Sequence, residues 1–385
     1  MEKFREELEN NILRFWMERM QDEENGGFYG AIDGHNVLIK KANKGVVMNS
    51  RILWTFSAAY RVLKDEAYLE IATRAYTYIK EYFIDPVYGG VFWELDYEGK
   101  PVNRKKQTYA QGFALYGFSE YYRATGLAEA LDLSIAFFEC IEKTRDTKHG
   151  GYWEAFAEDW TAIGDMRLSE KDENEAKTMN THLHILEPYT NLLRTWRDER
   201  LIHAQRELIY IFKDKIYDVE TGHLQLFFDD VWNTTGKTVS YGHDIEAAWL
   251  LWEAVSVLDE SPLKQELENV VKNITVVSTH GLLSDGSMAY ELKNGHLDKE
   301  RHWWVQAEAV VGYHHLSQLE GLKEFEGLYS ALWQYIQTEI VDKEHGEWYW
   351  SRLADGSVNR EEDKAGFWKC PYHNGRMCME MIEHQ

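Results

Sequence analysis

Three histidines and one glutamate stand out as residues suited to proton transfer. His243 and Glu246 lie three positions apart in YGHDIE, so on a helix their side chains are neighbours. A carboxylate beside an imidazole fixes its tautomer and raises its basicity. His184, in MNTHLH, and His373, in CPYHNGR, open similar apolar segments. Because imidazole titrates near neutral pH, this set indicates general acid–base catalysis, the alternative being hydrogen-bonded core histidines.

Other polar and aromatic residues open the same kind of segment, and we predict that they bind a ligand. Arg51 is the first of them, in MNSR. A buried guanidinium without a partner is costly, so Arg51 either pairs with a carboxylate or holds ligand oxygens, and we favour the ligand. The further candidates are Tyr109, Asn180, Trp303, Trp304, Glu308 and Trp368. Trp303 and Trp304 are adjacent and diverge on a helix, so at least one of them is expected to be structural.

A metal site built from the three histidines and Glu246 is an alternative, since imidazole and carboxylate both ligate zinc or manganese. No HExxH motif accompanies them, and the three cysteines form no CxxC pair. The sequence also lacks a glycine-rich phosphate loop. We therefore predict no metal and no cofactor, and we interpret His182, His314 and His315 as structural or surface residues.

The elements that must position these residues follow from an internal repeat. Six times, at intervals of about 60 to 70 residues, an acidic residue and a glycine lead into an aromatic-rich stretch. The copies lie at 22–29, 85–93, 146–153, 218–228, a worn one at 281–290, and 342–350. Each unit is long enough for two helices and a short β-turn element. We predict one domain over 1–385, an all-α (α/α)6 barrel with short β-hairpins or loops before the inner helices.

Two kinds of helix alternate along the chain. Amphipathic helices with charged faces are expected on the outside, near 3–20, 66–83, 127–144, 198–216, 262–279 and 321–340. Helices that are apolar nearly all round are expected inside, near 48–64, 108–123, 179–195, 243–258, 303–318 and 372–384. Parallel inner helices bring their N-terminal ends to one mouth of a central cavity. The candidate residues lie at those ends, which makes that mouth the predicted active site.

Composition and charge exclude several classes of function. The formal net charge of −23 repels nucleic acid and anionic lipid. The start, MEKFREELENNILRFW, lacks the apolar core of a signal peptide, and no run of 18 apolar residues occurs. Three cysteines without a CxxC pair fit a reducing compartment. We expect a cytoplasmic monomer or weak homodimer without nucleic-acid or membrane partners. The 15 Trp residues suit the stacking of sugar rings.

Longer stretches around these residues resemble the N-acylglucosamine 2-epimerase superfamily, and within it the cellobiose 2-epimerases. They are KGVVMNSRILW (44–54), KTMNTHLHILEPYTNL (177–192), SYGHDIEAAWLL (240–251), WWVQAEAVVGY (303–313), GEWYW (346–350) and WKCPYHNGRMCMEMI (368–382). They lie in order and span nearly the whole chain. The resemblance implies an (α/α)6 barrel and cofactor-free epimerisation at C2 of the reducing-end sugar of β-1,4-linked disaccharides. Cellobiose would give glucosyl-mannose and lactose would give epilactose, through ring opening and an enediolate.

The resemblance also implies roles for the candidate residues. His243, supported by Glu246, and His373 resemble the acid/base pair that flanks C2. His184 resembles the histidine that assists ring opening. Arg51, with Asn180 and Tyr109 nearby, resembles the residue that holds the enolate oxygens. Trp303 and Trp368 resemble the aromatic platforms for the sugar rings.

Three other functions stay open at this point. A mannose or glucose 2-epimerase, or an aldose–ketose isomerase, shares the histidines and differs in the outer pocket. An inverting (α/α)6 glycosidase needs two carboxylates about 6.5–9.5 Å apart, for which Glu246, Glu308 and Glu347 are available. A sugar-binding barrel without catalysis would leave the His243 and Glu246 pair unexplained.

Overall fold

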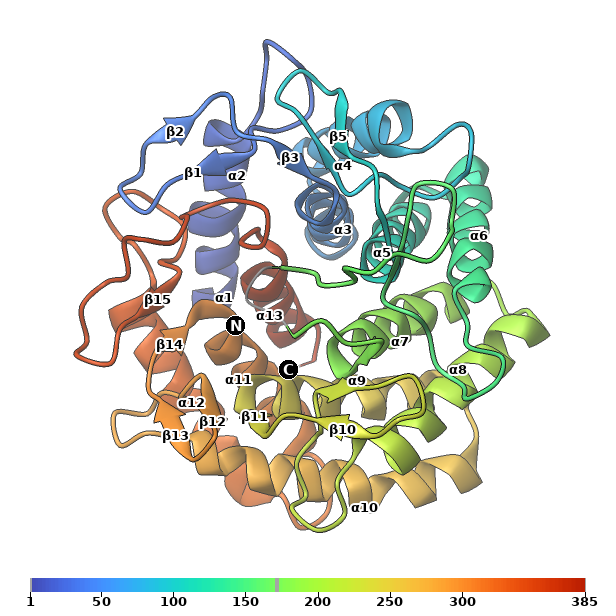
Figure 1. The fold of residues 1–385 in the computed structure, drawn as a ribbon. Coiled ribbons are helices and arrows are strands. Elements are labelled where there is room, and N and C mark those ends of the chain that lie inside the picture. Colours follow the sequence, from blue (N-terminus) through green and yellow to red (C-terminus); the bar gives the residue numbers. More distant parts are fainter. Residues whose placement is uncertain (1, 170–172, 385) are drawn as a thin grey trace.

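Twelve helical units alternate between an inner and an outer ring over the residues that the computed structural model describes, 2–169 and 173–384 (Figure 1). The inner helices are α3 Val46–Leu63, α5 Thr108–Thr125, α7 Met179–Leu193, α9 Tyr241–Leu258, α11 Trp303–Leu316 and α13 Tyr372–Glu383. Each lies within three residues of its predicted start, and they are buried over most of their length. The predicted (α/α)6 barrel is confirmed.

The outer helices have one buried face each. They are α1 Glu2–Glu7 with α2 Arg14–Arg19, α4 Glu66–Tyr78, α6 Ala128–Lys143, α8 Glu199–Ile211, α10 Ser261–Ser278 and α12 Glu326–Tyr335. Asp65 caps α4 by accepting a hydrogen bond from the Ala67 N–H. Residues 79–83, 212–216 and 336–340 continue α4, α8 and α12 as π-helical turns, and residues 8–13 join α1 to α2 in the same conformation. The helical periodicity of the sequence does not distinguish these wider turns from α-helix.

The repeated aspartate and glycine close a tight turn in five of the six units, and in the worn fifth copy the Gly286 N–H donates to the Leu283 carbonyl instead. In the first unit the Gly26 N–H donates to the Asp22 carbonyl, and Oδ1 of Asp22 accepts from the amides of Glu24 and Asn25. The six repeat glycines have φ between 74° and 87°. Only glycine adopts this left-handed conformation without a steric cost, which explains why it recurs at this position.

Short strands form the rim on which the inner helices start. They are β1 Ala31–Ile32, β2 Leu38–Ile39, β3 Lys44–Gly45, β4 Glu94–Leu95, β5 Pro101–Asn103, β6 Lys106–Gln107, β7 Ala155–Phe156, β8 Lys177–Thr178, β9 Phe227–Phe228, β10 Thr234–Thr235, β11 Thr238–Ser240, β12 Glu291–Lys293, β13 His296–Asp298, β14 Arg301–His302 and β15 Ser351–Arg352. The strand before each of the first five inner helices pairs with a strand of the next unit, all antiparallel: β3 with β4, β6 with β7, β8 with β9, β11 with β12 and β14 with β15. Ile32 and Ala365 form the sixth pairing, so the first and last units close the ring.

Four buried ion pairs fix this rim to the turns. The lysine that precedes an inner helix donates to the repeat aspartate in Lys44–Asp22, Lys106–Asp85, Lys177–Asp146 and Lys364–Asp342. Although burial opposes ionisation, the lysine and the turn amides hold the pKa of each aspartate below its usual range. A buried charge is tolerated only when it is paired in this way, so the four pairs fix the starts of α3, α5, α7 and α13. Within the described ranges, no helix is long and apolar enough to span a membrane.

Candidate active site

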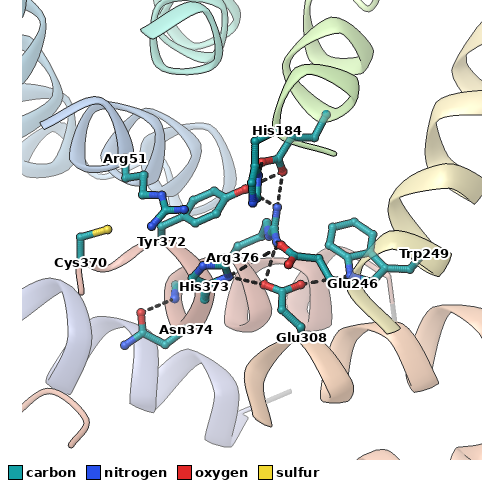
Figure 2. Close-up of polar contacts among 12 residues, drawn as sticks. Arg51, His184, Glu246, Trp249, Glu308, Cys370, Tyr372, His373, Asn374 and Arg376 are labelled. Atoms are coloured by element: carbon teal, nitrogen blue, oxygen red, sulfur yellow. Dashed lines mark hydrogen bonds and ion pairs between the residues drawn. The ribbon is translucent and has the colours of Figure 1, made fainter. Parts of the chain in front are cut away.

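The six inner helices begin at the strand rim, and their first turns converge on the barrel axis (Figure 1). Figure 2 shows side chains from α7, α9, α11 and α13 meeting there around one buried guanidinium, that of Arg376. Its Nη1 donates to Glu187 and Tyr372, and its Nη2 donates to Glu246 at 2.8 Å and to Glu308 at 2.7 Å. One cation therefore links three buried carboxylates.

Two of the three predicted histidines are held by these carboxylates. Nδ1 of His184 lies 2.6 Å from Oε1 of Glu187, and Nδ1 of His373 lies 2.6 Å from Oε1 of Glu308. The other oxygen of Glu308 accepts from the indole N–H of Trp249 at 3.1 Å. Because Nδ1 is engaged in both rings, Nε2 is the atom that each presents for proton transfer.

The predicted pairing of His243 with Glu246 is wrong. Nδ1 of His243 lies 2.8 Å from the Ser240 hydroxyl, whereas Oε1 of Glu246 accepts from Arg376. The i, i+3 spacing does bring both residues onto one face of α9. However, the Arg376 side chain of α13 reaches Glu246, and its guanidinium binds the carboxylate. Glu246 belongs to the buried cluster and lies 3.9 Å from Nδ1 of His373.

Burial sets the protonation of the three histidines. It lowers the pKa of His184, although the Glu187 carboxylate opposes it. It lowers the pKa of His373 to about 4 against the opposing effect of Glu308, and that of His243 to about 3, aided by the neighbouring histidines. All three imidazoles are therefore neutral at neutral pH, the state in which Nε2 accepts a proton.

The carboxylates differ in charge. Burial would raise the pKa of Glu187, but Arg376 and His184 outweigh it and lower the value to about 2. For Glu308, Arg376 and His373 also overcome burial and hold the pKa below its usual range. Burial and the charge of Glu308 instead raise the pKa of Glu246 well above its usual range. Glu187 and Glu308 are thus the ionised partners of the histidines, and Glu246 is the member of the cluster whose pKa is raised.

Arg51 reaches the site without a carboxylate partner of its own. Its Nη2 donates to the Tyr109 hydroxyl at 2.9 Å and its Nη1 to the Trp368 carbonyl at 3.2 Å. The guanidinium also lies over the Phe113 ring, 4.2 Å from its centroid, and Nε is buried without a hydrogen-bond partner. Tyr109 packs edge-on against His184 at 5.0 Å. A cation with uncommitted hydrogen-bonding capacity beside the His184 imidazole is suited to hold a developing oxyanion.

Of the adjacent residues Trp303 and Trp304, one faces the histidines and the other is structural, as predicted. The Trp304 ring lies 4.7 Å from the His243 ring and 5.8 Å from that of His373, and it is partly exposed. Trp303 is 3% exposed and packs on Trp350 at 4.5 Å, so it forms the wall behind the site. Trp368 is partly buried against Tyr109 and Trp93. Trp304 therefore has the stronger claim to contact a ligand at the histidines.

A cavity of about 320 Å³ opens from the site toward the rim. Asn180 and His243 line its floor, and Tyr290, Glu291 and Lys293 line its outer wall. The Asn180 Oδ1 atom is buried without a hydrogen-bond partner. An unsatisfied amide oxygen in a polar cavity is suited to accept a hydrogen bond from a ligand hydroxyl.

The residues present do not fit a metal ion at this site. Potential ligand atoms of Glu246, Glu308 and His373 lie within 4.8 Å of one another. The Arg376 guanidinium already contacts both carboxylates, so a metal ion would have to displace a buried cation. The same distance places Glu246 and Glu308 closer together than the carboxylates of an inverting glycosidase.

The central residues that the sequence analysis missed are Glu187, Tyr372 and Arg376. Glu187 follows His184 at i+3, the same signal that drew attention to Glu246 after His243. Arg376 follows His373 at i+3 in the same way. The same i, i+3 spacing occurs in all three pairs, so the signal that singled out Glu246 applies equally to Glu187 and Arg376.

Replacing Glu308 by Gln is expected to lower the rate and to shift the acidic limb of the kcat/KM profile to lower pH. The limb reports protonation of His373, and the lost negative charge lowers the pKa of that imidazole further below about 4. Glu246→Gln is the matched control, since Oε1 of Glu246 lies 3.9 Å from Nδ1 of His373, against 2.6 Å for Oε1 of Glu308. Circular dichroism at each pH verifies folding. If the acidic limb of the kcat/KM profile moves in Glu246→Gln and stays unchanged in Glu308→Gln, then Glu246 and not Glu308 is the carboxylate that sets the pKa of His373.

Comparison with known proteins adds to this geometry. A model of the N-acylglucosamine 2-epimerase (GlcNAc 2-epimerase) family matches residues 27–375. Cellobiose 2-epimerase from Bacteroides fragilis is 54% identical over 99% of this chain and 98% of its own length, and that from Ruminococcus albus is 42% identical over 99% and 97%. The structure of cellobiose 2-epimerase from Bacillus thermoamylovorans matches with a TM-score of 0.95 and 43% identity, covering 100% of this chain and 99% of the other. With a family match over most of its length and relatives this similar, the chain belongs to the N-acylglucosamine 2-epimerase family.

Proposed function

We propose that this protein is an epimerase that inverts C2 of the reducing-end sugar of β-1,4-linked disaccharides, converting cellobiose to glucosyl-mannose and lactose to epilactose. One observation carries the chemistry. His184, His243 and His373 have neutral imidazoles at the starts of inner helices; Figure 2 shows His184 and His373 near Arg51, and the His243 and His373 rings share the neighbour Trp304. The relatives named as cellobiose 2-epimerases support the substrate class.

The reaction begins with ring opening, because the C2 proton is acidic only beside a free aldehyde. His184, held by Glu187, takes the proton of O1 and returns one to O5. A neutral imidazole of the His243 and His373 pair then removes the C2 proton. Arg51 stabilises the enediolate oxygens that result. The first imidazole then loses its proton to solvent, and the other imidazole takes one up at Nε2 and returns it to the opposite face of C2, so both imidazoles end neutral and no net proton is gained or lost.

The outer cavity favours a disaccharide over a single sugar. It extends from His243 and Asn180 to Tyr290 and the β12 residues Glu291 and Lys293, beyond the reach of the ring that reacts. A mannose or glucose 2-epimerase, or an aldose–ketose isomerase, needs the same histidines without that space. Trp304 lies between the imidazoles and this outer wall, where a pyranose face can stack on it.

Turnover in D₂O tests the proposal. Cellobiose is expected to give an epimer that carries deuterium at C2 of the reducing-end residue, seen by NMR as loss of the H2 signal, while the non-reducing ring stays unlabelled. The reason is that the imidazole proton exchanges with solvent between abstraction and return. Lactose, mannose and glucose in parallel reactions rank the substrates.

Three outcomes of this experiment would contradict the proposal. An epimer without deuterium after many turnovers would exclude the enediolate. Release of glucose from cellobiose would indicate a glycosidase. Turnover of mannose or glucose with cellobiose left unchanged would assign the monosaccharide reaction.

A further inference from the structure

The opposite end of the barrel holds a second cavity, of about 530 Å³. Residues from the middle and the C-terminal parts of the inner helices line it, among them Trp54, Tyr116, Trp249 and Glu253. Glu380 on α13, His384 at the C-cap of α13 and His315 on α11 line this cavity. The proposed epimerase chemistry uses none of these three residues.

His315, Glu380 and His384 form a compact cluster. Nε2 of His315 lies 3.1 Å from Oε2 of Glu380, and Nε2 of His384 lies 3.3 Å from the same oxygen. Potential ligand atoms of all three residues lie within 4.8 Å of one another. The two imidazole rings are 4.8 Å apart. Two nitrogens and one carboxylate oxygen thus face a common point between two helices.

These separations fit a tetrahedral ion. Zinc binds imidazole nitrogen and carboxylate oxygen at about 2.0–2.2 Å, which places neighbouring ligand atoms about 3.3–3.6 Å apart. The two separations to Oε2 of Glu380 are close to this spacing. The i, i+4 spacing of Glu380 and His384 puts both on one face of the end of α13. His314 Nε2 lies 3.2 Å from the His384 carbonyl, which fixes the backbone at this ligand.

The surrounding charges favour a cation here, unlike the catalytic cluster. There, Arg376 already contacts both carboxylates. At this end of the barrel, Arg194 pairs with Glu253, and Arg61 pairs with Glu120 and Glu383. The Glu380 carboxylate contacts the two imidazoles, which ligate a metal when neutral.

We propose that His315, Glu380 and His384 bind a divalent transition-metal ion, zinc by ligand type, with a fourth position open to the cavity. The ion links α13 to α11 and so strengthens the closure of the ring, since α13 is its last inner helix. It acts as a structural ion, because its ligands lie at the C-terminal end of α13 and His373 lies at the other. Two histidines and a carboxylate suit zinc or cobalt, while calcium and magnesium prefer oxygen ligands.

Cobalt titration tests the site directly. Protein stripped with EDTA and desalted is titrated with CoCl₂, and the visible absorption of four-coordinate cobalt is followed. The wild type is expected to bind one equivalent saturably. His315→Gln and His384→Gln are each expected to weaken binding at least about 10-fold, the low end of what outer-shell partners alone contribute. His203→Gln, at an exposed histidine on α8, is the matched control and should bind as the wild type does.

Thermal unfolding gives the second readout. Zinc at about 100 times its Kd is expected to raise the Tm of the wild type by about 3–5 °C, and to leave that of His384→Gln unchanged. His384 is exposed, so this variant keeps its fold even if His315→Gln does not. Epimerase activity of the stripped protein should equal that of the loaded protein.

The proposal is overturned by any of three results: absence of saturable cobalt binding up to millimolar concentration, binding as tight in His384→Gln as in the wild type, or binding that Glu308→Gln abolishes. The last would place the ion in the catalytic cluster. Deuterium incorporation at C2 is measured on the stripped protein, so failure of the proposed epimerase function is distinguished from failure of this ion site.

Discussion

Replacing His373 with alanine is expected to lower kcat for cellobiose by about 10⁴-fold or more. General acid–base groups contribute about 10²–10⁴-fold each, and an obligatory proton carrier belongs at the top of that range. His373 meets the structural requirements for such a carrier. Glu308 fixes its tautomer at 2.6 Å, burial keeps the ring neutral, and Trp304 packs beside it. His243→Ala is expected to show a loss of the same order, because inversion needs a proton on each face of C2.

Folding must be verified for both variants, since each removes a buried or half-buried ring. Circular dichroism and thermal unfolding serve for this, and His203→Ala, at an exposed site, controls for the loss of a histidine as such. If a folded His373→Ala or His243→Ala retains more than about a tenth of wild-type activity, that histidine does not carry a proton in the reaction. Deuterium wash-in at C2 measured on the same variants separates lost proton abstraction from lost proton return.

Replacing Arg51 with methionine is expected to lower kcat by about 10²–10³-fold, the usual effect of removing one oxyanion donor. The guanidinium lies between Tyr109 and Phe113 with its Nε unpaired, so it holds capacity for the enediolate oxygens. Because the charge develops in the intermediate, kcat should fall much more than KM rises. Arg51→Lys keeps the positive charge but loses the planar fork of the guanidinium. Its kcat is expected to lie between that of the wild type and that of Arg51→Met.

The matched control removes a guanidinium elsewhere on the rim, at a position that the proposed reaction does not use. Arg104, which is exposed and pairs with Glu158, should tolerate alanine without a change in kcat. If Arg51→Met raises KM and leaves kcat unaltered, Arg51 binds the ground state only, and the enediolate is stabilised by other groups.

The sequence by itself determined the barrel and the mouth where the candidates gather. The aspartate and glycine of each repeat act locally, since the aspartate caps its own turn and the glycine adopts the positive φ that the turn requires. Hydrophobic periodicity is also local and separated the inner helices from the outer ones within a few residues. The positions of His184, His243, His373 and Arg51 at inner-helix starts follow from these two signals.

Only the tertiary structure decided which carboxylate serves which histidine. The i, i+3 spacing also relates Glu187 to His184, and the structure brings that pair together within α7, although the sequence analysis did not propose it. For His243 the same spacing predicts Glu246, yet that carboxylate turns to Arg376 on α13, and His373 takes its partner Glu308 from α11. The partners are 130 and 65 residues apart in the chain. Such pairings depend on how closely the helices approach in a buried, low-dielectric centre, where three carboxylates compete for one cation. Periodicity along a single helix carries no information about that competition.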